Sequence, residues 1–242
     1  MILECRNLNN ILLLGSDTPH RRFIINKLLD AGHNITSCLF PSSIVKPRFN
    51  ADSPWASEEK KELKDLYLRE TREDLDRVST VHCPASLTLD DPLVRPTIEN
   101  ADFVIVSGAD RIRDDVLSVI ENKSLNVHMG IAEEYRGLDS NLWAWYHRDY
   151  KNIGVSLHKL ETTLDTGDLF QVERIKITEQ TKVWELRYLE SVLAVTVIGK
   201  SLNNLVADKV IVRNQKSIGR YYSYMPFDLK KCLPITPNKL LL

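Results

Sequence analysis

Short, nearly uninterrupted apolar runs are the feature that most constrains how this chain can fold. Residues 102–107 read DFVIVS, and Ile11 to Leu14 forms a similar run that ends in Gly15-Ser16-Asp17. A strand whose alternating side chains are all apolar is covered on both faces, as in parallel sheets flanked by helices. The sequence therefore predicts an α/β fold with a mostly parallel central sheet.

The first forty residues read as a strand, a turn, a helix and a second strand. Pro19 stands at the expected start of the helix and Gly32 at its end, which is the usual placement of these two residues. The second strand is expected near Ile35 to Phe40. A dinucleotide site is the alternative, but only Gly15 follows the first strand and no GxGxxG is present. A plain strand–helix–strand turn is the favoured interpretation.

Composition excludes several classes of function. The chain has 242 residues, of which 43% are hydrophobic and 27% charged, which is globular composition. Its 32 Lys and Arg against 33 Asp and Glu give a net charge of −1. This balance offers no general attraction to nucleic acid or to anionic membranes, so neither is expected as a partner. No apolar run reaches the roughly 20 residues of a membrane span.

The cysteines and the N-terminus suggest a cytoplasmic location. Four cysteines are spread along the chain without a CxxC pair, namely Cys5, Cys38, Cys83 and Cys232. They fit neither a zinc site nor a disulfide framework, and they suggest a reducing compartment. The N-terminus lacks the basic and apolar regions of a secretory signal. We therefore expect a cytoplasmic protein without a metal.

A charged segment follows the second strand. Ser53-Pro54 can cap a helix that runs to about Val78 and carries a thin apolar stripe through residues such as Leu63 and Leu75. The favoured interpretation is a solvated surface helix. A lid or a partner-binding helix is the alternative.

Two polar side chains share one face of a later strand. In residues 125–128, which read LNVH, Asn126 and His128 project together and Leu125 and Val127 project to the other side. An amide and an imidazole at a strand end can both donate to one developing oxyanion. For the pair alone, an inert structural role with mutual hydrogen bonds is the favoured interpretation.

The following segments add a carboxylate. Glu134 to Gly137 reads as a turn, an aromatic helix runs through Asn141 to Tyr146, and a strand covers Ile153 to Leu160. Leu164-Asp165-Thr166-Gly167-Asp168 is then a loop with two carboxylates around a glycine. Such a carboxylate can orient and charge a histidine or accept a proton.

Taken in order, these pieces resemble the formyltetrahydrofolate-dependent formyltransferases. The resemblance rests on Asn126-Val127-His128, Tyr135-Arg136-Gly137, Gly154-Val155 and the loop 164–168, and it is clear over residues 101–178. The family usually has Pro-Ser after its histidine, whereas this chain has Met129-Gly130. The resemblance implies a Rossmann-like formyltransferase fold.

The resemblance implies transfer of a formyl group from N10-formyltetrahydrofolate, as co-substrate, to a primary amine. Asn126 and His128, the latter as imidazolium, would donate to the tetrahedral oxyanion. Asp165 would keep His128 charged and help to remove the amine proton. Fixed donors meet the developing charge, so neither a metal nor a covalent intermediate is required.

The resemblance also implies which positions of this chain form the folate pocket. The backbone around Gly108, Asp110, Arg111 and Ile112 would hold the pteridine ring, and the loop from Glu161 to Asp165 would close over it. Arg111 could also be a solvated residue at a helix start. His158 could be structural or part of the pocket.

The C-terminal part bears on the acceptor. A helix is expected over residues 182–204, followed by a hairpin of Val210 to Arg213 and Arg220 to Tyr224. We therefore expect a catalytic domain over residues 1–180 and a helix-plus-hairpin extension over 181–242. Methionyl-tRNA formyltransferases carry a larger C-terminal barrel, and glycinamide-ribonucleotide formyltransferases a glycine-rich loop that Gly15 to Pro19 copies poorly.

Sugar N-formyltransferases, which act on nucleotide-linked amino sugars, commonly end in a tyrosine-rich hairpin like residues 219–226. Tyr135, Tyr222 and Tyr224 are then candidates for acceptor binding, with sheet packing as the alternative. Three hypotheses remain: this sugar N-formyltransferase, a formyltransferase or formyltetrahydrofolate hydrolase with another acceptor, and a non-catalytic folate-binding protein. A homodimer is compatible with each of them.

Overall fold

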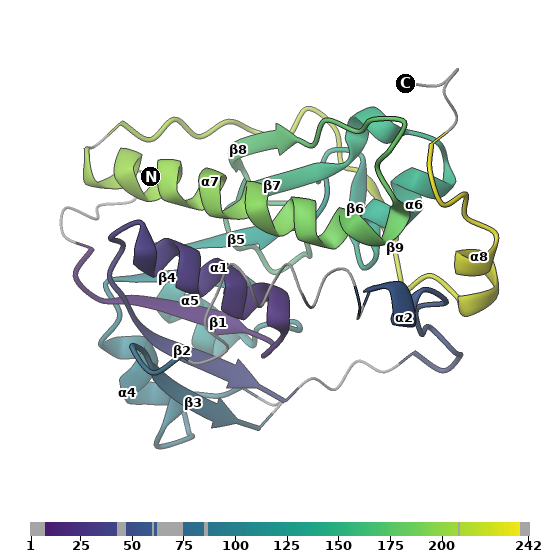
Figure 1. Ribbon diagram of the computed structural model, residues 1–242. Coiled ribbons are helices and arrows are strands. Elements are labelled where there is room, and N and C mark those ends of the chain that lie inside the picture. Colours follow the sequence, from purple (N-terminus) through teal and green to yellow (C-terminus); the bar gives the residue numbers. More distant parts are fainter. Residues whose placement is uncertain are drawn as a thin grey trace.

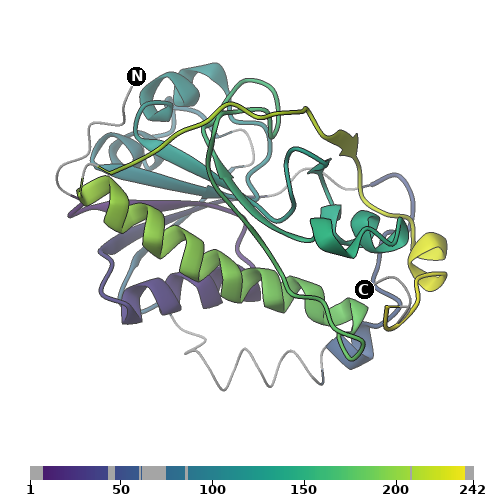
Figure 2. The ribbon, with the colours of Figure 1, turned by 90° about the horizontal axis from the view of Figure 1, so that it is seen from above.

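The molecule is a three-layer α/β structure. A computed structural model describes residues 8–42, 47–59, 61, 75–84, 87–207 and 209–237. Its centre is a seven-stranded sheet of order β3-β2-β1-β4-β5-β7-β8, with helices on both faces (Figures 1 and 2). The strands are β1 Ile11–Gly15, β2 Ile35–Pro41, β3 Ser79–Cys83, β4 Phe103–Ser107, β5 Ser124–His128, β7 Gly154–His158 and β8 Leu169–Arg174.

The helices are α1 Pro19–Asp30, α2 Ala56–Glu58, α4 Val94–Glu99, α5 Asp114–Ile120, α6 Ser140–Tyr146, α7 Leu186–Val206 and α8 Phe227–Lys231, with 3-10 turns η2 Tyr150–Asn152 and η3 Val183–Glu185. The pairs from β3 through β5 are parallel, and β5–β7 and β7–β8 are antiparallel. This arrangement confirms the predicted α/β class with a mostly parallel sheet.

Alternation along the buried strands divides the core into two halves. Ile11 and Leu13 of β1 pack under α1 and α7, whereas Leu12 and Leu14 pack under α4 and α5 on the other face. All five residues of β4 are buried, as the apolar run predicts for a strand covered on both sides. In Figure 2, α1 and α7 lie together on one side of the sheet and α4 and α5 on the other.

The strand order reverses between β1 and β4, so the carboxyl ends of these strands flank a topological switch point. In open α/β sheets this edge is where ligands bind. β5 lies next to β4 and ends at the same edge because the two strands are parallel. The polar residues at the end of β5 therefore lie close to the place where this class of fold binds its ligands.

Residues 135–137 form a strand rather than the predicted turn. This strand, β6 Tyr135–Gly137, pairs in parallel with β9 Arg220–Tyr222. The predicted hairpin is therefore corrected: Arg213 forms only an isolated bridge with Leu169, and β9 finds its partner in β6. The backbone groups of a three-residue strand need a partner, and the sequence alone does not show that residues 85 positions earlier supply it.

The remaining predictions are met to different degrees. The predicted C-terminal helix is present as η3 and α7, and α7 lies against α1, β7 and β8. The charged segment begins as the short α2, but most of it, residues 60 and 62–74, lies outside the described residues. A third apolar cluster joins α6 to the C-terminal part through Trp145, Trp184 and Met225. The proposed boundary at residue 180 stays a prediction.

Candidate active site

Strand β5 presents two polar side chains on one face. Leu125 and Val127 are buried in the core half under α1 and α7. Asn126 and His128 therefore project to the opposite side at the carboxyl end of the strand. The His128 side chain is 6% exposed, so its ring is almost completely removed from water. The geometric expectation of a shared face agrees with the structure.

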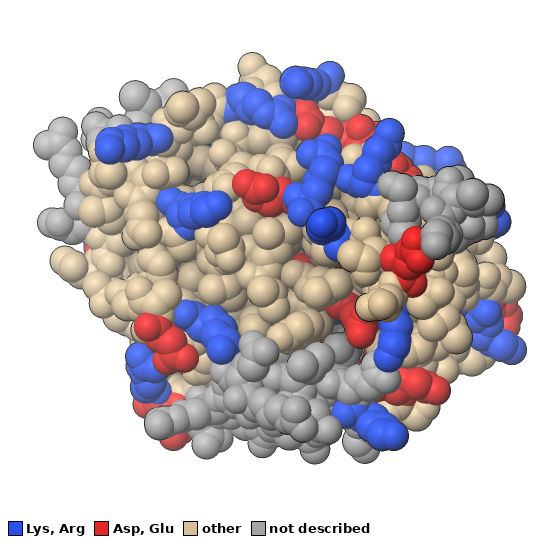
Figure 3. All heavy atoms as spheres, turned by 45° about the horizontal axis from the view of Figure 1, so that its top comes forward, with Lys and Arg blue, Asp and Glu red and all other residues tan. Residues whose placement is uncertain are grey.

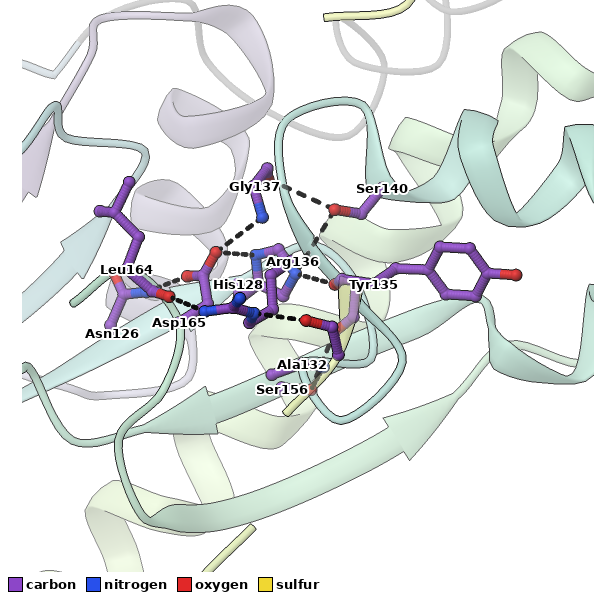
Figure 4. A network of polar contacts seen from close by, with 12 residues as sticks. Asn126, His128, Ala132, Tyr135, Arg136, Gly137, Ser140, Ser156, Leu164 and Asp165 are labelled. Atoms are coloured by element: carbon purple, nitrogen blue, oxygen red, sulfur yellow. Dashed lines mark hydrogen bonds and ion pairs between the residues drawn. The ribbon is translucent and has the colours of Figure 1, made fainter. Parts of the chain in front are cut away.

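Asp165 joins these residues into one cluster. Its Oδ2 lies 3.5 Å from His128 Nδ1, and its Oδ1 lies 3.4 Å from Asn126 Nδ2 (Figure 4). The same Oδ1 lies 3.3 Å from His158 Nε2. The structure thus brings together the three predicted catalytic residues and adds His158. These separations are longer than a tight charged hydrogen bond of about 2.7–2.9 Å.

The backbone holds Asp165 in an unusual conformation. Its φ is +56°, in the left-handed region that residues other than glycine seldom adopt. The Gly137 backbone amide donates to Asp165 Oδ2 at 2.9 Å. Burial by itself raises the pKa of Asp165, but His128, His158 and the Gly137 amide together hold that pKa well below its usual value. The carboxylate is therefore ionised at neutral pH.

His128 lies between two acceptors. Its Nε2 is 2.8 Å from the Tyr135 carbonyl oxygen, and its Nδ1 faces Asp165. Only the imidazolium can donate in both directions at once. Burial nevertheless lowers the pKa of His128 more than Asp165 and the carbonyl raise it. Neutral imidazole is thus favoured without substrate, which differs from the imidazolium expected from the resemblance.

A glycine makes room for the His128 ring. A Cβ at Gly130 would lie 2.5 Å from His128 Nε2 and 2.7 Å from Ser140 Cβ. The Gly130 carbonyl accepts a hydrogen bond from Ser156 Oγ at 2.8 Å, which fixes the loop after β5 to β7. The Met129-Gly130 departure is therefore accommodated by local packing that requires a residue without a side chain.

His158 belongs to the cluster through strand pairing. It lies opposite Asn126 in the antiparallel β5–β7 register, and its Nδ1 donates to the Lys159 carbonyl at 2.7 Å. Its Nε2 lies 3.0 Å from Asn126 Nδ2 and thus faces both that amide and the Asp165 carboxylate. The sequence carried only one hint of this, namely a histidine at the end of the strand before the Asp165 loop.

The residues predicted for the folate pocket lie in the segments that come after β4 and after β7. Gly108 and residues 110–112 come directly after β4, and Glu161 is exposed in the loop after β7. Gly108 has φ +59°, and a Cβ there would overlap the Arg21 guanidinium. Ile112 packs against the core half under α4 and α5, whereas exposed Arg111 lines a shallow hollow of 360 Å³ beside α5.

The three candidate tyrosines have different surroundings. The Tyr135 ring points away from Asp165 in Figure 4, and its hydroxyl donates to Asp149 at 3.2 Å. Tyr222 stacks on Tyr135 and on Trp143, with ring centroids 5.6 Å and 4.9 Å apart. Tyr224 lies beyond the end of β9. Burial raises its pKa, as do the charges of Asp139 and Asp110, so it lies within electrostatic range of the residues after β4.

Within the described residues, no group of three or more His, Cys, Asp or Glu side chains gathers in a way that could hold a metal ion. Among the helices of this part of the chain, none has the length and apolar character needed to cross a bilayer.

Fold and site together define an α/β protein with an amide, two imidazoles and an ionised carboxylate at the carboxyl edge of a parallel sheet, a set of groups suited to acyl transfer. Residues 90–189, which contain the whole cluster, match the profile of the formyl transferase family. This segment of the chain is therefore similar to formyl transferases.

A curated relative supports this assignment for part of the chain. A methionyl-tRNA formyltransferase from Finegoldia magna is 33% identical over 106 residues, which cover 43% of this chain and 34% of the relative. The match thus spans about a third of that relative's length.

Solved structures share the fold at low identity. The formyltransferase PseJ from Anoxybacillus kamchatkensis, in complex with UDP-4,6-dideoxy-4-formamido-L-AltNAc and tetrahydrofolate, has a TM-score of 0.55 at 16% identity, covering 88% of this chain and 85% of its own. A sugar N-formyltransferase from a Shewanella species gives 0.60 at 12%, covering 90% and 77%. Glycinamide ribonucleotide transformylase 1 from Symbiobacterium toebii gives 0.60 at 15%, covering 86% and 94%. At these identities the likeness concerns the fold alone.

Proposed function

We propose that this protein transfers the formyl group of N10-formyltetrahydrofolate to the primary amine of a nucleotide-linked amino sugar. The observation that carries the proposal is the convergence of Asn126, His128 and Asp165 within a segment that matches the formyl transferase family. Folate-bound relatives of the same fold support the co-substrate, since PseJ was solved with tetrahydrofolate.

The proposed chemistry follows from the hydrogen-bond donors and the proton acceptor that these side chains provide. The amine nitrogen attacks the formyl carbon, and the carbonyl oxygen becomes an oxyanion. His128, neutral before the substrates bind, takes up a proton in this proposal and becomes the imidazolium. Asn126 Nδ2 and His128 Nδ1 then donate to the oxyanion in place of their long contacts with Asp165. Asp165 takes the proton of the attacking amine, directly or through water. Collapse of the intermediate breaks the bond to N10 of the folate, and this nitrogen receives the proton.

A partly buried arginine supports an acceptor that carries phosphate. Burial and the nearby Arg187 lower the pKa of Arg21 to about 10, and its Nε is buried without a hydrogen-bond partner. Among the described residues no carboxylate forms an ion pair with Arg21. A cation in such surroundings is stabilised by an anion, and phosphate pairs well with arginine.

A second candidate is formylation of methionyl-tRNA. The curated relatives that match the chain in sequence include several methionyl-tRNA formyltransferases. Their similarity covers 43%, 48% and 63% of this chain and at most half of each relative's own length. It therefore supports the reaction type better than it supports the acceptor.

An acceptor panel tests the proposal. The protein is incubated with N10-formyltetrahydrofolate and, in separate reactions, amino sugar nucleotides with different bases, methionyl-tRNA, glycinamide ribonucleotide or water alone. Mass spectrometry measures formylated product and released formate. We expect formylation of at least one amino sugar nucleotide, and its loss in Asp165→Asn, which keeps the size of the side chain but removes the base. Formylation of methionyl-tRNA alone, or formate release alone, contradicts the acceptor assignment.

A further inference from the structure

The loop that carries Asp165 is held from outside by a distant part of the chain. Residues 213–219, which we call the strap, lie about 50 positions after the loop and run alongside it. The strap is fixed at its start by Arg213, whose two terminal nitrogens lie 2.7 and 2.8 Å from the Glu133 carboxylate. The Lys216 backbone amide also donates to Glu133, and Ser217 Oγ donates to its carbonyl oxygen. Glu133 follows β5, so the strap is tied to the strand that carries His128.

Gln215 connects the strap to the Asp165 loop. Its Nε2 donates to the carbonyl oxygen of Asp165 at 2.9 Å and to that of Gly167 at 2.8 Å. The two hydrogens of the Gln215 amide thus bind the carbonyl oxygens on either side of residue 166. These two hydrogen bonds fix the turn in which Asp165 takes its left-handed conformation. A Cβ at Gly167 would lie 2.0 Å from the Lys159 carbonyl oxygen, so the loop has little space to shift.

Arg136 makes a second connection between the strap and the Asp165 loop. Its Nη1 donates to the Leu164 carbonyl at 3.0 Å, and its Nε donates to the Gly219 carbonyl at 2.6 Å. Arg136 lies in β6, directly before Gly137, whose amide binds the Asp165 carboxylate. The backbone carbonyls of residues 164, 165 and 167 are thus each bound by a side chain from elsewhere in the protein (Figure 4 shows the Arg136 contact).

We propose that the strap sets the position of the Asp165 carboxylate, with Gln215 and Arg136 as positioning residues for the proposed formyl transfer. Both side chains bind carbonyl oxygens of the loop, and among the described residues neither forms a hydrogen bond or ion pair with Asn126, His128 or the carboxylate itself, so both act through the loop backbone. The contacts of Asp165 with the three nitrogens lie between 3.3 and 3.5 Å. A shift of about 1 Å would break them, and misplacements of that size can cost about 10²-fold in rate.

The test compares three variants in the full chain. Gln215→Met keeps the size and neutrality of the side chain but removes both donors, and Gln215→Lys restores a donor of similar reach. Ser217→Ala is the matched control, because it removes a strap hydrogen bond that does not touch the Asp165 loop. We expect kcat of Gln215→Met to fall about 10²-fold with the acceptor KM changed less than threefold. Gln215→Lys should recover most of the loss, and Ser217→Ala should stay within twofold of the unaltered protein.

A second readout does not depend on turnover. Asp165 raises the pKa of His128, while His158 and Arg187 oppose it. If the strap positions Asp165, Gln215→Met should lower the pKa of His128 measured by NMR, and Ser217→Ala should leave it unchanged. Arg136→Gln has a side chain too short to reach the Leu164 carbonyl, so it should also lower the pKa of His128. This variant replaces Gln215→Met in the test if Gln215→Met does not fold.

The two readouts separate this inference from the proposed function. An unchanged kcat and His128 titration in folded Gln215→Met would overturn the positioning role. A changed titration in a protein that formylates no acceptor would support the positioning role and count against the proposed function.

Discussion

Asp165 carries its charge in a nearly dry place because nitrogen atoms surround it. Two imidazoles, the Asn126 amide and the Gly137 backbone amide all approach its two oxygens. A buried carboxylate without such partners would take up a proton. The same arrangement makes it a base with donors beside it, so an incoming amine and the oxygen of a formyl group would each find a complementary atom.

Asn126→Ala should lower turnover by about 10²–10³, the usual cost of losing one oxyanion donor. Asn126 is partly exposed and is no part of the apolar core, so the fold and folate binding should be nearly unchanged. Steady-state kinetics with saturating folate, and circular dichroism as the folding control, check this. A folded variant that loses less than tenfold in turnover would show that Asn126 is not an oxyanion donor.

The losses caused by His128→Ala and Asp165→Ala should not multiply. The two side chains face each other, and removing either disables the pair in the proposed mechanism. The double variant should therefore be little slower than the slower single variant. A complete double-mutant cycle of kcat measures this, and independent losses in folded proteins would rule out a coupled pair.

At the scale of elements, the strands that build the site could be predicted and their pairing could not. The apolar run of residues 102–107 and the alternation in Leu125 to His128 are local patterns, and both appear as β4 and β5. The role of His158 depends on the β5–β7 register, and that of Gln215 on a strap tied to Glu133. Such contacts join residues about 30 to 80 positions apart, and the hydrophobic periodicity of neighbouring residues does not reveal them. Burial along α7 shows the same limit, because apolar Val192 is 40% exposed while acidic Glu190 is fully buried.

The tyrosines of β9 and its extension should separate into two kinds. Tyr222 is stacked between Tyr135 and Trp143, so Tyr222→Ala should lower stability by about 2 kcal/mol with little effect on acceptor affinity. Tyr224→Ala should raise the acceptor KM, because Tyr224 lies within electrostatic range of Arg21 and Asp110. Exposed Tyr221, replaced by Ala, is the control. Thermal melts and acceptor KM values measure both effects, and equal KM values for all three variants would make the segment purely structural.

Helix α7 contains a buried acid that should make stability depend on pH. Burial raises the pKa of Glu190 from 4.5 to about 7, although Arg187 and a 2.8 Å hydrogen bond from Asn141 oppose this. The folded protein therefore binds this proton more tightly than the unfolded chain does. This contribution to stability is complete below pH 4.5 and is lost as pH rises to about 7, by about 3 kcal/mol.

Glu190→Gln should remove this loss. Urea unfolding of both proteins at pH 5 and pH 8 measures the free energy of unfolding, and the variant should lose less stability between these values. An identical loss in both proteins would mean that Glu190 titrates normally.

At the scale of the whole molecule, the candidate site is assembled from segments that lie between residues 126 and 219. The carboxyl edge of the sheet supplies Asn126 and His128, the loop after β7 supplies Asp165, and the strap after α7 holds that loop in place. The C-terminal part thus contributes to the same site as the segment that matches the family. On the face shown in Figure 3, acidic and basic side chains are interspersed, in keeping with the net charge of −1.

The charge distribution leads to a prediction about salt that separates the two candidate acceptors. A protein that holds a nucleic acid through 6–10 phosphate contacts loses about 10³–10⁵ in affinity between about 50 and 200 mM salt, because condensed counterions are released on binding. A sugar nucleotide offers only the two phosphates of its diphosphate to residues such as Arg21. We therefore expect kcat/KM for the amino sugar nucleotide to fall less than about tenfold over this range. The folate KM, measured in the same solutions, controls for general effects of salt on the enzyme. A fall of more than about 100-fold for the acceptor, with the folate KM unchanged, would point to a polyanionic acceptor such as methionyl-tRNA.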